Sequence, residues 1–499
     1  MAAPIDEPCL SRAENLPSEE HERLLSERDE LGDPKPPEQL STPGLLLLTC
    51  PSLGLQVSWF LLQSSGTPYL GSLGMTPSSI SLTWALGPIF GAFLQPIIGQ
   101  LSDELDHPLG RRKPVMIAGA LTTVIPTLLM ACAPELTAPF TENPAANPWQ
   151  PRALAVACLV IILLAINAYS VGVRAIVVDA CPPSQQPAAA AWSMRWNVLG
   201  SAALSTAGFV YTTQSSETDP VVAFRTLACV AAICSATTVG LVCWLVPRDA
   251  TPPLRLSGSG SEIGRVWAMC LPGELVRRWR RLPPLTGRVC GVQLFGWFGW
   301  FPVLFYMSTY AYETALSESL QASNLEPSPA ETHAKPYPLY ASLSFSLGTL
   351  LSTVLLSCLS RIHTVLNPRN LPRLWLVSQL LATTSLLLTI PFQTSTVSLI
   401  LLSLIGATWA VTMWIPFALI NTELAHVRTG VAGVQGLHNM AISLPQVASA
   451  LVCAAVLAGL DSVGVGRGAV WLMRLAAVPV AWSTWLIWRL DAKELVGVY

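Results

Sequence analysis

Three polar side chains interrupt the apolar stretch 153–174 and could act together on a polyhydroxylated molecule. Asn167, Ser170 and Arg174 follow one another at i, i+3 and i+7, which places them on one face of a helix. A guanidinium can donate several hydrogen bonds to a polyol without losing its charge. The alternative is structural: Arg174 reaches the membrane surface and pairs with Asp179, although five residues turn the two side chains about 140° apart on an ideal helix.

The apolar stretch 45–66 has a second polar face. Gln56, Trp59 and Gln63 share one side of a helix, and Tyr69 follows shortly after them. Amides bond hydroxyl groups, and an aromatic ring stacks on the apolar face of a sugar. The same amides could instead hold neighbouring membrane helices together, and the sequence leaves this alternative open.

Aromatic, amide and ionisable residues recur in the second half of the chain. The expected binding residues there are Trp297, Trp300, Trp409, Asn439 and Gln446. The carboxylates that could transfer a coupled proton are Asp179, Glu313 and Glu423, although a solvated surface charge also explains Glu313.

The elements that must position these residues are membrane-spanning helices. Hydrophobic residues make up 52% of the chain and charged residues 12%, with a mean hydropathy of +0.50. Soluble domains usually contain about 25% charged residues. We therefore predict an all-α membrane protein with twelve spans, near 45–66, 79–101, 115–133, 153–174, 190–211, 223–246, 288–308, 338–360, 372–391, 397–420, 440–459 and 468–488.

Lys and Arg are distributed unequally between the two sides of these spans. With the N-terminus inside, the inner loops and the C-terminal tail hold seventeen Lys and Arg, and the outer loops hold three, Arg152, Lys335 and Arg467. This bias predicts that both termini are cytoplasmic. The outer loops contain no cysteine pair, so we expect no disulfide framework.

The spans divide into two sets of six. We predict an acidic disordered tail over 1–43, six-helix bundles over 44–246 and 288–488, a basic cytoplasmic linker over 247–287 and a C-terminal tail over 489–499. Transporters of this build move a substrate by rocking one bundle against the other.

The turn Gly99-x-x-Ser102-Asp103, followed by Gly110-Arg111-Arg112-Lys113-Pro114, resembles the loop signature of the major facilitator superfamily. Its wide Asp-to-Gly spacing is similar to that of the sucrose and α-glucoside transporters, in the glycoside–pentoside–hexuronide symporter group. The resemblance extends to Arg174-Ala-Ile-Val-Val-Asp179, Gly299-Trp300-Phe301-Pro302 and Trp409-Ala-Val-Thr-Met-Trp414. The strings in the tenth and eleventh spans look most like those of fungal members.

This resemblance implies alternating access, with Asp103, Arg111 and Arg112 closing the cytoplasmic side and Arg174 in the transport path. It also implies proton-driven disaccharide uptake. The chain departs from the pattern at one position. Family members usually have an Asp eleven residues before the fourth-span Arg, where this chain has Leu163. A leucine cannot hold a proton, so coupling would need another group.

We expect a sugar transporter that moves sucrose or another α-glucoside, possible alternatives being an uncoupled facilitator and a non-transporting sugar sensor. We expect no enzyme activity, because the sequence contains no GxSxG, HExxH or paired intramembrane Asp motif and its carboxylates do not cluster. The expected partners are the sugar, a proton where transport is coupled, and the lipid bilayer, without nucleic acid, cofactor or metal. For localisation we favour the plasma membrane over the vacuole.

Overall fold

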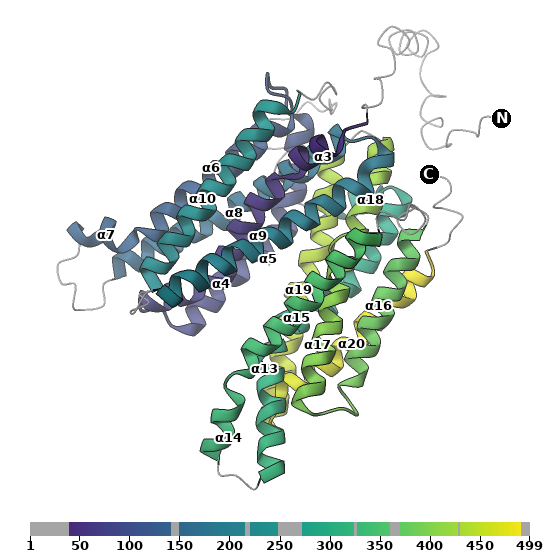
Figure 1. The fold of residues 1–499 in the computed structure, drawn as a ribbon. Coiled ribbons are helices and arrows are strands. Elements are labelled where there is room, and N and C mark those ends of the chain that lie inside the picture. The colour runs from purple at the N-terminus through teal and green to yellow at the C-terminus, as the bar shows by residue number, and fades with distance from the viewer. Residues whose placement is uncertain are drawn as a thin grey trace, which may run out of the picture. The chain divides into compact units, whose positions relative to one another are not determined.

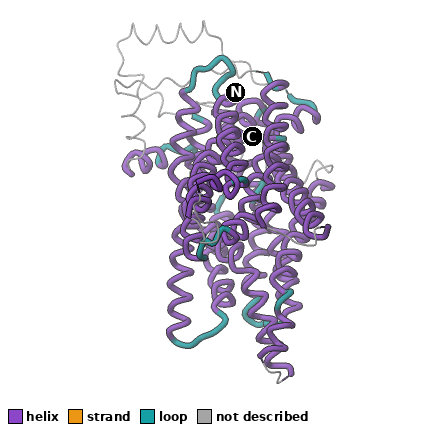
Figure 2. Tube along the Cα trace, turned by 90° about the vertical axis from the view of Figure 1, so that its left-hand side faces the viewer, coloured by secondary structure: helices purple, strands orange, loops and turns teal. Residues whose placement is uncertain are grey.

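A computed structural model describes residues 39–140, 149–214, 220–247, 272–323, 327–359, 370–427 and 430–490. Within these ranges every regular element is a helix, as Figure 2 shows. The all-α prediction is therefore confirmed. Most of the predicted tail 1–43, much of the linker 247–287 and nearly all of the tail 489–499 lie outside the described residues.

The first half of the chain forms an N-terminal bundle, coloured purple to teal in Figure 1. It consists of the short helix α3 (Thr42–Thr49) and the long helices α4 (Pro51–Ser72), α5 (Pro77–Glu104), α6 (Arg112–Ala131), α8 (Trp149–Ala180), α9 (Gln186–Gln214) and α10 (Pro220–Leu245). Short elements join them: α7 (Ala133–Thr137), η1 (Ala138–Phe140) and η3 (Pro183–Gln185).

The second half forms a C-terminal bundle, coloured green to yellow in Figure 1. It consists of α12 (Pro272–Trp279), α13 (Pro284–Ser323), α14 (Pro327–Ala334), α15 (Tyr337–Leu359), α16 (Leu371–Leu388), α17 (Ser395–Thr412), α18 (Ile415–Val427), α19 (Val431–Ser462) and α20 (Gly468–Trp488).

Eleven described stretches are long and apolar enough to cross a membrane, with α3–α4, α14–α15 and α17–α18 each counted as one. They correspond to all the predicted spans except 190–211. That segment forms α9, whose length suffices for a crossing. Its polar residues, among them Gln186, Arg195 and Asn197, lower its mean hydropathy.

Three predicted spans differ from the helices that contain them. The fourth continues to Ala180, so that Arg174 lies inside α8 rather than at its end. The seventh becomes a helix of 40 residues, α13. The tenth is broken between Thr412 and Ile415. Pro416 lies in the first turn of α18, where backbone amides have no acceptor within the helix, so a proline costs no hydrogen bond.

We call the face of the bundles at which α3 begins and α20 ends the terminal side. In the half of the helices nearest this side, α5 lies against α19 and α9 lies against α18 (Figure 1). Glycines permit the first contact, because a Cβ atom on Gly99 would lie 2.2 Å from the Ala432 carbonyl oxygen. One on Gly436 would lie 2.4 Å from Pro96 Cα. The two bundles therefore touch backbone to backbone.

Candidate functional site

Arg174 reaches from the N-terminal bundle to the C-terminal bundle. Its Nη1 donates a hydrogen bond to Asn439 Oδ1 over 3.3 Å, and its guanidinium carbon lies 4.9 Å from the centre of the Phe417 ring. The side chain is half-buried. Asp179 instead pairs with Arg111 and Arg112, so the structural alternative that paired it with Arg174 is not what the structure shows.

The Arg174 junction, as we name the group Arg174, Phe417, Gln435, His438 and Asn439, is built largely by one face of α19. Asn439 Nδ2 donates to the Gly91 carbonyl oxygen over 2.9 Å, so this one amide contacts both α8 and α5. His438 is buried, and its ring lies 4.8 Å from that of Phe417. Among the described residues, His438 Nε2 and Gln435 Oε1 have no hydrogen-bond partner.

Asn167 and Ser170 lie on α8 with Arg174, as their spacing predicts, and both are buried. Asn167 Oδ1 accepts a hydrogen bond from Gln95 Nε2 over 2.9 Å, and its Nδ2 donates to the Leu163 carbonyl oxygen over 2.6 Å. These bonds stay within the N-terminal bundle. Asn167 therefore joins α8 to α5, whereas Arg174 joins the two bundles.

The predicted polar face of the first span separates into different environments. Gln56 Nε2 donates to Ser201 Oγ on α9 over 3.0 Å, which is the helix-joining role left open above. Trp59 is half-buried and Gln63 is exposed. Tyr69 has no exposed surface, stacks on Phe224 at 4.4 Å and donates its hydroxyl to the Met130 carbonyl oxygen. Tyr69 is thus a core residue, and its position does not support contact with a cargo.

Trp297, Trp300 and Trp409 form one aromatic cluster in the C-terminal bundle. The Trp409 ring lies 5.4 Å from Trp297 and 4.9 Å from Trp300, and Trp409 keeps part of its surface exposed. The indole N–H groups of Trp297 and Trp300 are buried without a partner among the described residues. The cluster therefore offers part of the Trp409 ring as an aromatic face, whereas the two indole N–H groups are enclosed. Gln446, by contrast, donates to its own helix at the Ile442 carbonyl oxygen.

Two of the three proposed proton carriers cap helices inside the C-terminal bundle. Glu423 accepts hydrogen bonds from the backbone amides of Leu285 and Thr286, at 3.1 and 2.6 Å, at the start of α13. Glu313 accepts from the amides of Ala469 and Val470 at the start of α20, at 3.2 Å each. Both carboxylates neutralise helix N-termini, which explains their position without proton transfer.

The third candidate, Asp179, belongs to a buried charge cluster at the terminal side. Arg112 donates from Nε to Asp179 over 2.6 Å and from Nη2 to Asp103 over 2.7 Å, and Arg111 contacts Asp179 at 3.3 Å. Asp103 also accepts from the amides of Ala432 and Gly433, at 3.2 and 2.8 Å. The cluster thereby attaches the N-terminal bundle to the first turn of α19.

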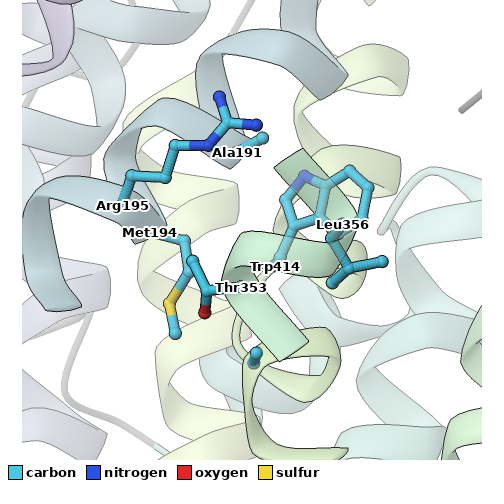
Figure 3. A pocket seen from close by; sticks show the side chains of 7 residues that line it. Ala191, Met194, Arg195, Thr353, Leu356 and Trp414 are labelled. Carbon is cyan, nitrogen blue, oxygen red and sulfur yellow. The ribbon is translucent and has the colours of Figure 1, made fainter. Parts of the chain in front are cut away.

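A pocket lies between the two bundles and is lined by side chains from both. Figure 3 shows its lining side chains. From the N-terminal bundle, α9 contributes Ala191, Met194 and Arg195. From the C-terminal bundle, α15 contributes Thr353 and Leu356, α17 contributes Ala410, and Trp414 follows α17. Trp414 also donates to the Pro187 carbonyl oxygen across the interface, over 3.1 Å. The pocket therefore exists only while the bundles are together here.

Sequence reasoning missed Gln95, Phe417 and Gln435 as parts of this region. A usable signal existed for Gln435, because Gln435, His438 and Asn439 follow at i, i+3 and i+4 in an otherwise apolar helix. Phe417 offered none, since an aromatic residue in a membrane helix usually packs against its neighbours or faces lipid.

Two facing helical bundles, joined at one end by hydrogen bonds, with an arginine of a candidate membrane-spanning helix at their interface, define a membrane transporter of the alternating-access class. Comparison of the sequence with known protein families supports this class. Residues 51–482 match the Major Facilitator Superfamily, and the chain belongs to this family.

Its curated relatives are permeases and transport proteins rather than enzymes. The chain is 27% identical to the General alpha-glucoside permease of Schizosaccharomyces pombe over 507 residues, covering 88% of this chain and 91% of the permease. It is 24% identical to the Sucrose transport protein SUT2 of Oryza sativa subsp. indica, covering 81% and 84%. These similarities confirm the resemblance to sucrose and α-glucoside transporters.

Solved structures share the fold. The proton:xylose symporter XylE, bound to 6-bromo-6-deoxy-D-glucose, superposes with a TM-score of 0.59 at 14% identity, covering 91% of this chain and 98% of XylE. The transporter FucP in its outward conformation superposes with a TM-score of 0.56 at 15% identity, covering 89% of this chain and 98% of FucP. Both similarities establish that this chain shares the fold of these transporters.

Proposed function

We propose that this protein transports a sugar across the plasma membrane by alternating access, with an α-glucoside such as maltose or sucrose as its cargo. The observation on which this depends most is Arg174, a guanidinium inside the membrane region with an amide and an aromatic ring as its side-chain contacts. Such a group keeps donors for hydroxyl oxygens. The α-glucoside permease and the sucrose transport protein, similar over most of their lengths, support this cargo class.

The Trp297–Trp300–Trp409 cluster would supply the opposite wall of the site. The partly exposed Trp409 ring suits the apolar face of a pyranose, and Trp297 and Trp300 support that ring from behind. Asp103, Arg111 and Arg112 would hold the terminal side closed while the site is open to the opposite side. The excess of Lys and Arg supports a cytoplasmic location for the terminal side.

The experiment is uptake of labelled maltose and sucrose in yeast that lacks its own α-glucoside transport. Removing charge-assisted hydrogen bonds costs about 1.5–3 kcal/mol, so Arg174→Ala is expected to raise KM roughly ten- to hundredfold. Arg225→Ala is the matched control, because Arg225 pairs with the half-exposed Glu135 near the opposite side. Normal uptake by Arg174→Ala, with the protein at the cell surface, would contradict the proposed site.

The driving force is tested in the same cells with an uncoupler. Glu313 and Glu423 are held as caps within one bundle, so a coupled mechanism would rely on the charge cluster around Asp103 and Asp179. Accumulation above the external concentration that collapses with uncoupler identifies proton symport. Uptake that stops at equilibrium and ignores the uncoupler identifies a facilitator.

A further inference from the structure

We propose that Asn439 is a clasp that holds Arg174 across the bundle interface, and that the sugar releases the clasp by taking its place on the guanidinium. This inference rests on the proposed function, because it assumes that Arg174 binds the cargo. It assigns Asn439 a positioning role in the conformational change, in place of the sugar contact expected from its sequence position.

The contacts of Asn439 leave it little capacity to bind a sugar in this conformation. Its Oδ1 accepts from Arg174 Nη1, and its Nδ2 donates to the Gly91 carbonyl oxygen and to Ser443 Oγ, at 2.9 and 3.1 Å. One side chain of the C-terminal bundle therefore connects to α5 and α8 of the N-terminal bundle together. Separation of the bundles must break both connections.

The bond to Arg174 is suited to being replaced. Its length of 3.3 Å exceeds the roughly 2.7–2.9 Å that charge-assisted N–H···O bonds usually show. A sugar hydroxyl oxygen is an acceptor of the same kind as the amide oxygen, so the two compete for the same donor. A cargo that arrives from the side opposite the terminal side would thus weaken an attachment between the bundles as it binds.

Two other polar residues of the Arg174 junction, Gln435 and His438, favour opening of the bundle interface. Gln435 Oε1 and His438 Nε2 are buried beside Asn439 on α19 and lack partners within the described part of the chain. Gln435 Nε2 donates to the Arg174 carbonyl oxygen and to Asn421 Oδ1, so Gln435 also contacts α8. Polar groups without a full set of bonds raise the free energy of the closed interface, which keeps its opening within reach of a ligand.

The test measures the separation of the bundles at the terminal side by double electron–electron resonance. Spin labels are placed at His107 and His426, which are exposed on the N- and C-terminal bundles, through an unnatural keto amino acid that leaves the native cysteines unchanged. Without sugar, Asn439→Leu is expected to shift the population towards the longer distance by roughly tenfold or more, because it removes the charge-assisted bond to Arg174 together with the bond to the Gly91 carbonyl. Asn439→Ala serves as the second variant where leucine prevents folding.

Two further variants separate the clasp from general damage. Gln446→Leu is the matched control, because this amide on the same helix bonds only its own helix backbone in the described structure, and its distances should equal those of the unmodified protein. Arg174→Leu should shift the population in the same direction but less, because it leaves the Asn439 bond to the Gly91 carbonyl in place. The double variant should shift it by less than the sum of the two single variants, since both remove the bond between Arg174 and Asn439.

Equal distances in Asn439→Leu, Asn439→Ala and the unmodified protein would overturn the clasp, and so would additive shifts in the double variant. These measurements without sugar do not depend on the cargo. A failure of the unmodified protein to bind maltose or sucrose would therefore contradict the proposed function while leaving the sugar-free result on the clasp intact.

Discussion

Gly99→Ala should open the terminal side without unfolding either bundle. A Cβ atom at position 99 would lie 2.2 Å from the Ala432 carbonyl oxygen and 2.5 Å from its carbon, where ordinary contact begins at 3.4 Å. Both atoms are backbone, so no side chain can rotate away, and α5 and α19 must separate by about 1 Å. Overpacking of this kind costs about 1–3 kcal/mol, which corresponds to a roughly 5- to 150-fold shift in population.

The His107–His426 label pair measures this shift, and the melting temperature reports on stability. Gly291→Ala is the matched control, because nothing lies within 4 Å of a Cβ built there. Gly119→Ala is the contrasting variant, since its Cβ would lie 2.3 Å from the Tyr169 amide nitrogen inside one bundle and should lower stability in every conformation. An unchanged distance distribution in Gly99→Ala would refute the reasoning that this glycine permits closure.

Three other predictions follow from the described contacts. Glu423→Gln should lower the free energy of unfolding by about 2 kcal/mol, because it weakens the bonds to the amides of Leu285 and Thr286, and a thermal melt in detergent checks this. Sugar uptake by this variant should keep the pH profile of the unmodified protein. A lost pH response would instead assign Glu423 to proton transfer. Leu163→Asp places a carboxyl one helical turn before Asn167 and should introduce or strengthen a dependence of uptake on external pH, so identical pH profiles would contradict the coupling argument. An epitope at the C-terminus should be reached by antibody only after permeabilisation, and labelling of intact cells would reverse the proposed orientation.

Local periodicity explains what the sequence predicted well. The 3.6-residue repeat placed Asn167, Ser170 and Arg174 on one helix face, and the apolar stretches located the helices that cross the membrane. Helix ends were less predictable. The apolar residues of α8 continue beyond the length that a bilayer crossing needs, so the helix extends to Ala180. Arg174 therefore lies inside the helix rather than at its end.

Contacts between distant segments could not be read from spacing. Glu313 and Glu423 look like possible proton carriers until the start of α20 and of α13 is found at their carboxylates. Tyr69 looks like a stacking residue until Phe224 and Met130 enclose it. In each case the partner lies on another helix, and the sequence contains no information on which helices face each other at that depth.

Binding of the sugar to purified protein tests the central claim most directly. Maltose and sucrose titrated into the unmodified protein and into Arg174→Ala, with Arg225→Ala as control, should bind to the first and third proteins and roughly ten- to hundredfold more weakly to the second. Equal affinity in all three proteins would contradict the assignment of Arg174 as the group that holds the cargo.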